Sequence, residues 1–155
     1  MITIQQQAAR MTRQAWEGLL RTAEFMPEDR REWVPQGKAR TFHDYMAECV
    51  VMADWGRELI ETGEFGAFDP EAYARAKAEL NTLDKIKAAG APAIERLIAA
   101  IEAFPDARLE ETKQMPWGFT QTYADMLFNA YWNMVYHWGQ VNYVQMMLGD
   151  TDMHA

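Results

Sequence analysis

The segment from Thr122 to Gly149 constrains the fold most, because it has the pattern of one long helix. Its apolar residues recur in steps of three and four, which places them on one face of an α-helix. His137 occupies a position on that face, and Asn133 and Asn129 precede it by one and two turns. An imidazole is therefore expected on the buried side of this helix. The apolar positions are Tyr123, Met126, Leu127, Ala130, Met134, Val141, Val144 and Leu148.

Three further helical patterns precede this segment. Apolar residues at helical spacing predict a first helix over residues 3–25 and a second from Thr41, a capping residue, to Gly63. Residues 70–103 keep one apolar phase although Gly90 and Pro92 interrupt it. This favours a kinked third helix, and a break near residue 90 is the alternative. No segment has a convincing strand pattern, so the sequence predicts an all-α four-helix bundle.

Length and composition narrow the class of protein. The 155 residues fit a single domain, expected to span 1–155, and the net charge of −8 opposes binding to nucleic acid. Four cations within residues 30–40 could attract a small anion or solvate a loop. We expect neither a signal peptide nor a membrane span, since no long apolar run occurs. Cys49 is the single cysteine, which fits a reducing cytoplasm.

His137 and Asn133 are the first candidates for a site, since side chains four positions apart on a helix can point at a common ion. His43 is the other histidine in a predicted helix. A metal site of His43, Asn133 and His137 is one interpretation. The other is that His137 is a core residue hydrogen-bonded to Asn133, with His43 at the surface. Paired cysteines, a glycine-rich phosphate loop, a nucleophile elbow and the Glu-x-x-His pattern of di-iron proteins do not occur in the sequence.

The stretch from Asn133 to Gln140, Asn-Met-Val-Tyr-His-Trp-Gly-Gln, resembles the fourth helix of the DinB/YfiT-like superfamily of metal-dependent four-helix proteins. There the matching stretch commonly reads His-x-x-x-His-Arg-Gly-Gln and runs to a Leu-Gly end, here Leu148-Gly149. Weaker matches are His43 at the start of the second helix, the turn Pro116 to Gly118, and Leu83-Asp84 at the start of the third helix. The matches span most of the chain, but only the Gly-Gln segment is specific.

The resemblance implies an up-down-down-up bundle in which residues 63 to about 80 form a long crossover between helices 2 and 3. It implies a divalent metal, often nickel or zinc, whose three ligands map onto His43, Asn133 and His137. It also implies a metal-dependent hydrolase or thiol transferase, in which the metal lowers the pKa of a bound water or thiol, and a homodimer. The alternative is a bundle without metal that binds a small ligand or serves as a scaffold.

Asn133 departs from the family pattern, which has histidine there. Its neutral amide oxygen is a poorer ligand for zinc or nickel than imidazole, so the sequence predicts a weakly bound metal or none. The second helix offers no clear replacement. Measured from His43, Asp44 and Glu48 are rotated by about 100° and 140° around the helix axis.

Trp138 is the second departure, because the family commonly has arginine there and an indole cannot bind an anion as a guanidinium does. Gly139 costs roughly 1 kcal/mol inside a helix relative to alanine, which predicts a close contact with a neighbouring helix. No catalytic residue can be assigned, and the small-molecule ligand is unknown. The expected ligand contacts are Asn129, Tyr136 and Gln140.

Overall fold

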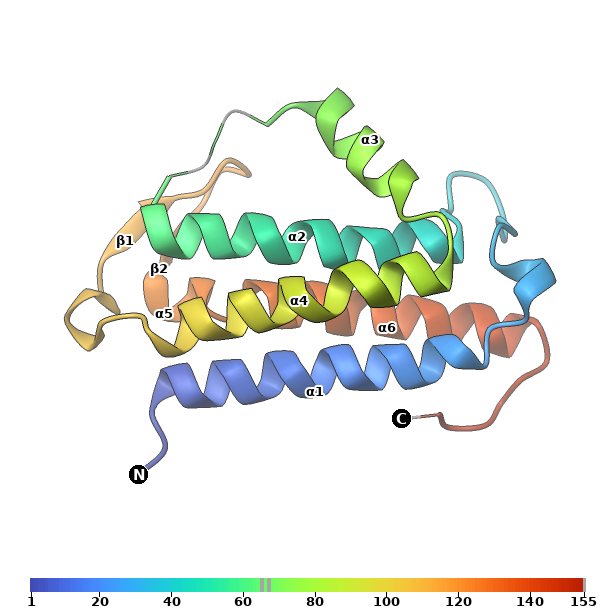
Figure 1. Cartoon of the computed structure of the whole chain (residues 1–155), viewed down its shortest axis with the longest axis horizontal. Coiled ribbons are helices and arrows are strands. Elements are labelled where there is room, and N and C mark those ends of the chain that lie inside the picture. The colour runs from blue at the N-terminus through green and yellow to red at the C-terminus, as the bar shows by residue number, and fades with distance from the viewer. Residues whose placement is uncertain (65, 67, 155) are drawn as a thin grey trace.

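The computed structural model describes residues 1–64, 66 and 68–154. Among these residues, four long helices lie side by side (Figure 1). Two of them run in one direction along the long axis and two run in the other. Each contacts two of the others, and one apolar core lies between them. The structure is mainly helical, as the sequence predicts. The helices are α1 (Ile4–Glu24) and α6 (Asn129–Met147) in one direction and α2 (Phe42–Thr62) and α4 (Leu83–Glu102) in the other.

Threonine caps set where the helices begin. Each accepts a hydrogen bond on its side chain from the backbone N–H three residues further on, which gives one otherwise unpaired donor a partner. The predicted start of α2 at Thr41 is confirmed. Its predicted end is confirmed as well, because Gly63 follows α2 with a φ of +72°, a left-handed conformation that glycine adopts at little cost. The capping residues are Thr3, Thr41, Thr82 and Thr122.

The predicted helix over residues 70–103 is two helices. α3 (Pro70–Glu79) ends before residues 80–82, and α4 then begins at Leu83, so the interruption does not lie near residue 90. The reason is a second start signal within the segment, the cap at Thr82. Pro92 stands inside α4 on its exposed side, where the carbonyl that loses its helical partner is close to solvent.

α3 lies within the connection from α2 to α4, on the outer side of α2 and inclined to it (Figure 1). The resemblance implies a long crossover over this connection, of which residues 65 and 67 lie outside the described residues. Asp69 caps α3, and Pro70 opens it. No side chain of α3 is buried. The helix is held to α2 at its surface, where Lys77 Nζ lies 2.7 Å from Asp44 Oδ1.

A β-hairpin precedes the last helices and corrects the expectation that the chain has no strand. β1 (Thr112–Gln114) pairs antiparallel with β2 (Thr120–Thr122). The turn between them contains the predicted Pro116-to-Gly118 segment, with Gly118 at a φ of +100°. Strands of three residues, largely exposed, are too short to show an alternating apolar pattern. Two 3₁₀ turns, Glu28–Arg30 and Asp106–Arg108, complete the described elements.

The predicted helix over residues 122–149 is interrupted at residues 127–128. A single turn, α5 (Tyr123–Met126), is capped by Thr122 and Asp125, and α6 begins only at Asn129. The apolar face continues across the interruption, since Leu127 is buried like Met134 and Val141. Periodicity therefore identified the buried residues but not the break. None of the described helices is both long enough and apolar enough to cross a membrane.

Two tryptophans pack on glycines of neighbouring helices. Trp16 of α1 lies on Gly90 of α4, and Trp138 of α6 lies on Gly18 of α1, so closely that a Cβ at either glycine would overlap with the indole. These glycines let α1 approach both neighbours. At Gly139, in contrast, an added Cβ would meet nothing within 4 Å. The predicted close contact at Gly139 is therefore wrong.

The contact at Gly90 can be tested with a matched pair of substitutions. Gly90→Ala should lower the free energy of unfolding by about 1–3 kcal/mol, because its Cβ would overlap with Trp16 and lie 3.1 Å from Val50 Cγ2. Gly56→Ala should not destabilise, because the nearest atom, on Leu97, is 3.9 Å away and alanine favours a helix by roughly 1 kcal/mol. Urea unfolding measures both, and equal effects of the two substitutions would contradict this packing.

Candidate functional site

Glu48, on α2, is the centre of a polar cluster between α2 and α6. Its Oε1 accepts a hydrogen bond from Nδ2 of Asn133 at 3.3 Å and lies 3.1 Å from Nε2 of His137. Its Oε2 forms an ion pair with Arg40, in the loop before α2. Asn133 and His137 thus meet at a common group, as their spacing predicts. That group is the carboxylate of Glu48 on α2. The sequence indicated no clear replacement ligand on this helix, because Glu48 is rotated by about 140° from His43 around the helix axis.

The surroundings of Glu48 keep it ionised. Burial alone raises the pKa of its carboxyl, but hydrogen bonds from His137 and Arg40, together with their charges, outweigh burial and hold the pKa well below its usual range. Burial lowers the pKa of Arg40, and the hydrogen bond and charge of Glu48 more than reverse this. A charged pair therefore lies at the edge of the core at neutral pH, with each partner stabilising the ionised form of the other.

His137 is almost completely buried and is held on both ring nitrogens. Its Nδ1 lies 2.7 Å from Oε1 of Gln140, one turn along α6, and its ring stacks on Tyr45 of α2. When Nδ1–H donates to Gln140, the neutral ring presents the lone pair of Nε2 to Oε1 of Glu48. Two acceptors 3.1 Å apart require a proton or another cation between them. In the other neutral tautomer Nε2–H donates directly to Oε1 of Glu48 and the amide of Gln140 donates to Nδ1, so no cation is required.

His43 does not contact this cluster. Its Nδ1 pairs with Glu32, its ring is tilted against Phe42, and its Nε2 is buried without a hydrogen-bond partner among the residues that the structure describes. His43 lines a cavity of about 270 Å³ beneath α3, together with Lys77. Among the described residues, no group of three or more His, Cys, Asp or Glu side chains is arranged to hold a metal. A metal held by His43, Asn133 and His137 together stays a prediction that these contacts do not support.

The predicted ligand contacts lie in different places. Gln140 is at the cluster, where it fixes the ring of His137. Asn129 exchanges two hydrogen bonds of 3.2 Å with the amide of Gln121 and so ties α6 to the hairpin. Tyr136 is exposed on the outer side of α6. Only Gln140 is therefore in a position to influence chemistry at Glu48.

α3 closes the cluster from the outside. Asp44, one turn before Glu48, binds both Arg40 at 3.1 Å and Lys77 of α3 at 2.7 Å. Burial and the nearby charge of Glu48 raise the pKa of Tyr73, also on α3, so its hydroxyl stays protonated at neutral pH. Sequence reasoning missed this part of the site, because it considered Arg40 only as one of the four cations of residues 30–40 that could attract a small anion or solvate a loop. The one available signal was the spacing of Arg40, Asp44 and Glu48, which repeats every four residues.

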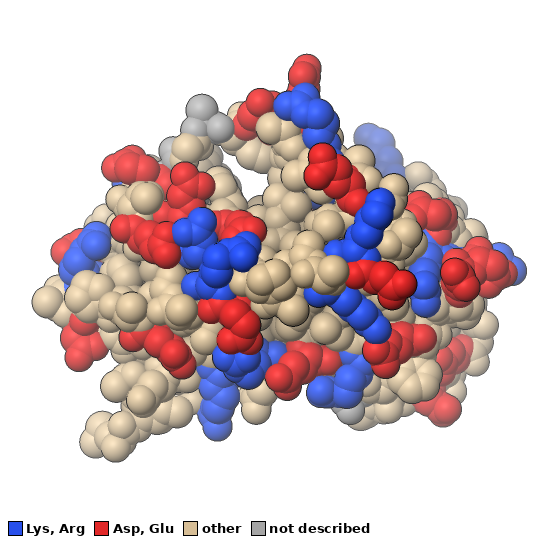
Figure 2. Space-filling model, in the orientation of Figure 1, with Lys and Arg blue, Asp and Glu red and all other residues tan. Residues whose placement is uncertain are grey.

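A mainly apolar cavity of about 270 Å³ lies between α2 and α3, and Figure 2 shows the molecule hollowed beside α3. Tyr73 lines this cavity and also lies beside Glu48, so it connects the cavity with the polar cluster. The cavity is large enough for a small organic molecule. Its other lining residues include Val51, Met52, Trp55, Phe68, Ala72 and Ala76.

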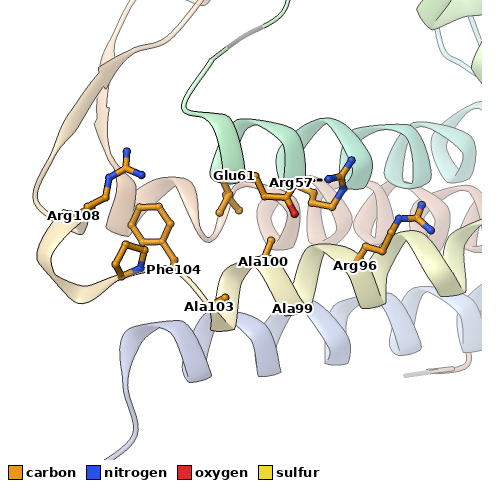
Figure 3. Close-up of a pocket in the computed structure, with 10 residues that line it drawn as sticks. Arg57, Glu61, Arg96, Ala99, Ala100, Ala103, Phe104 and Arg108 are labelled. Atoms are coloured by element: carbon orange, nitrogen blue, oxygen red, sulfur yellow. Dashed lines mark hydrogen bonds and ion pairs between the residues drawn. The ribbon is translucent and has the colours of Figure 1, made fainter.

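A larger cavity, of about 480 Å³, lies at the other end of α2 and α4 (Figure 3). Three arginines line it, and each has a carboxylate partner, so their charge is already compensated. Neither Glu48 nor a histidine lines this cavity. We therefore place the candidate site at Glu48 and not at the larger cavity. The three ion pairs are Arg57 with Glu61, Arg96 with Asp54, and Arg108 with Glu111.

The charge of Glu48 should make stability depend on pH. Glu48→Gln should lower the free energy of unfolding at pH 7 by about 1–3 kcal/mol, since Arg40 and His137 lose a charged partner. The folded-state pKa of Glu48 is lowered, so its stabilisation is complete above the unfolded-state pKa and is lost as the pH falls through the folded-state pKa. Urea unfolding should thus show a difference between native protein and variant that shrinks on acidification.

Glu95→Gln is the matched control for this experiment. A hydrogen bond from Arg13 also lowers the pKa of Glu95, but the pair is exposed to solvent. Solvent screens such pairs, so little change is expected at any pH. A cost of Glu48→Gln that did not vary with pH, or one that matched Glu95→Gln, would contradict the role of the Glu48 charge.

Comparison with known proteins identifies the fold. No family model matches the sequence, and no curated protein matches it. Two solved structures of mycothiol-dependent maleylpyruvate isomerase are similar, a histidine-to-alanine mutant with a TM-score of 0.71 at 16% identity and a second structure with 0.66 at 14%. Each comparison covers 91% of this chain and 63% of the isomerase, so the chain spans less than two thirds of that protein. At this identity the likeness shows a shared fold.

Proposed function

We propose that this chain is a DinB-like four-helix bundle of up-down-down-up topology and acts as a metal-dependent hydrolase or thiol transferase. The helix directions in Figure 1 and the crossover that contains α3 support the topology. The fold shared with a mycothiol-dependent isomerase supports thiol chemistry as the first reaction class to test. In this proposal nickel or zinc is bound at Glu48, Asn133 and His137. Glu48 thus takes the place that the sequence assigned to His43.

The observation that carries the metal proposal is the approach of Nε2 of His137 to Oε1 of Glu48, at 3.1 Å. Nε2 of His137 faces Oε1 of Glu48, while Nδ1 of His137 is hydrogen-bonded to Gln140. Histidines that bind a metal through one ring nitrogen commonly make such a hydrogen bond with the other. Oδ1 of Asn133, on the same side of α6, is buried and has no hydrogen-bond partner in the described part of the chain. One imidazole, one carboxylate and one amide oxygen form a donor set that suits weak binding of a divalent cation.

The protein side chains have separate roles in this proposal. Gln140 holds His137 in the tautomer that frees Nε2, and Arg40 holds the outer oxygen of Glu48 and fixes its direction. Tyr73 stays protonated and can donate a hydrogen bond to a substrate that enters from the apolar cavity. A bound metal would supply Lewis acidity, which lowers the pKa of a thiol or water.

A non-catalytic small-ligand-binding bundle is the second candidate, and the apolar cavity beside Tyr73 supports it. Its walls are largely carbon, which suits a compact apolar or aromatic molecule. In this case Nε2–H of His137 donates to Glu48 in place of a metal, and the ion pair of Glu48 with Arg40 is structural.

Metal binding separates the two candidates. Titration calorimetry of untagged protein with Zn²⁺ or Ni²⁺ should show one site, which His137→Ala and Glu48→Gln each weaken at least about tenfold through loss of a ligand. His43→Ala is the control, because His43 contacts Glu32 and not the cluster, and it should bind as the native protein does. Loss of binding in His43→Ala with retention in Glu48→Gln would instead support the set predicted from sequence. Native protein that binds neither ion would overturn the metal proposal.

The second candidate has its own test. Anilinonaphthalene sulfonate, an apolar fluorescent probe, should bind the native protein, and Ala72→Phe should weaken that binding about tenfold or more by filling the cavity between α2 and α3. Ala91→Phe, an exposed position on α4 that does not line this cavity, is the control. Equal affinity of both variants for the probe would contradict ligand binding in this cavity.

A further inference from the structure

The cavity of about 480 Å³ in Figure 3 has a cationic lining, although the chain as a whole is acidic. Among the described residues it is lined by the guanidinium groups of Arg57, Arg96 and Arg108 but by one carboxylate, that of Glu61. The carboxylates that pair with Arg96 and Arg108 do not line the cavity. In a chain with a net charge of −8, such a lining favours a small anion as ligand.

The ion pairs of Arg57 and Arg96 compensate their charge but do not use all of their hydrogen-bond donors. A guanidinium group has five N–H donors. Arg57 donates to Glu61 through Nη1, and its Nε is 3.7 Å from Oδ1 of Asp54, beyond hydrogen-bond distance. Arg96 binds the same Asp54 through Nε and Nη2, which leaves Nη1 outside that ion pair. Two guanidinium groups thus meet around Asp54, and an anion at this end can accept hydrogen bonds from both.

Arg108 stands at the other end of the cavity and is held in place before any ligand binds. Its guanidinium carbon lies 5.4 Å from the ring centre of Phe104 and 4.9 Å from that of Tyr123. Such cation–π contacts use the face of the guanidinium plane, whereas its N–H donors point outward from the edge. Because Arg108 is already fixed, binding an anion there costs little ordering of the side chain.

The floor between the two ends is apolar and made of small residues. Figure 3 shows Ala99, Ala100 and Ala103 between Arg96 and Arg108. Methyl side chains leave the space that longer side chains on this surface of α4 would fill. The floor from Arg96 to Ala103 is about 10 Å long at about 1.5 Å per helical residue, a length that an extended dicarboxylate of about six carbons spans with its two carboxylate groups.

We propose that this cavity binds an organic dianion that has a hydrocarbon chain with a carboxylate at each end. One carboxylate accepts hydrogen bonds from Arg57 and Arg96, the other accepts them from Arg108, and the chain lies on the alanine floor. A small inorganic anion can reach only one of the two ends. The site does not include Glu48 and needs no metal, so it does not rest on the proposed function.

Titration calorimetry with adipate, a six-carbon dicarboxylate, tests the site. The native protein should bind adipate at one site, and hexanoate, which has one carboxylate, at least about tenfold more weakly, because one end loses its charge-assisted hydrogen bonds. Arg96→Lys and Arg108→Lys keep the charge but lose the planar fork of donors, so each should weaken adipate binding about tenfold or more. Arg13→Lys is the control, because Arg13 pairs with Glu95 and does not line the cavity.

Three results of this titration would overturn the proposal. They are native protein that does not bind adipate, equal affinity of the Arg13, Arg96 and Arg108 variants, and inorganic sulfate that binds as tightly as adipate. The last result would show general attraction of anions and not a site with two ends.

A substitution in the floor tests where adipate binds. Ala99→Leu, at an exposed position, should fill the hollow and weaken adipate binding about tenfold or more with unchanged far-UV circular dichroism. Ala91→Leu, also exposed on α4 but outside the cavity, is its control. Glu48→Gln should bind adipate as the native protein does. Loss of binding in Glu48→Gln with retention in Ala99→Leu would place adipate at the polar cluster and overturn the proposal.

Discussion

A carboxylate at the edge of an apolar core is stable only when donors surround it, and Glu48 has donors on both of its oxygens. These contacts connect three parts of the chain, because Asn133 and His137 belong to α6 and Arg40 to the loop before α2. Through Asp44 the same network reaches Lys77 on α3. One ionised group thus links α2, α6 and the loop before α2, and through Asp44 the network also reaches α3.

The sequence allowed prediction of features that depend on neighbours along the chain. The cap at Thr41, the stop at Gly63 and the meeting of Asn133 with His137 at a common group all follow from spacing and local hydrogen bonding. The Glu48 contact could not be derived in this way. Its rotation was measured from His43, which assumes that His43 faces α6, whereas helical spacing gives only relative directions and the tertiary packing decides which face is turned inward.

Trp138 shows how a departure from a family pattern is accommodated by packing. Its indole lies on Gly18, and its Nε1–H donates a hydrogen bond of 2.7 Å to Oγ1 of Thr22, so the side chain joins α6 to α1. The large ring fits because α1 has a glycine directly beneath it. Sequence reasoning recognised the loss of an arginine but could not identify this gain, since the compensating residues lie more than a hundred positions away.

The way α3 is attached has a consequence for entry to the site. α3 buries none of its side chains, and a salt bridge from Lys77 and the partly buried ring of Tyr73 hold it against α2. Helices with so little buried surface open at a free-energy cost far below that of global unfolding. The backbone amides of α3 should therefore exchange with solvent sooner than those of α2. Such local opening would expose the cavity between α2 and α3 while the four long helices stay folded.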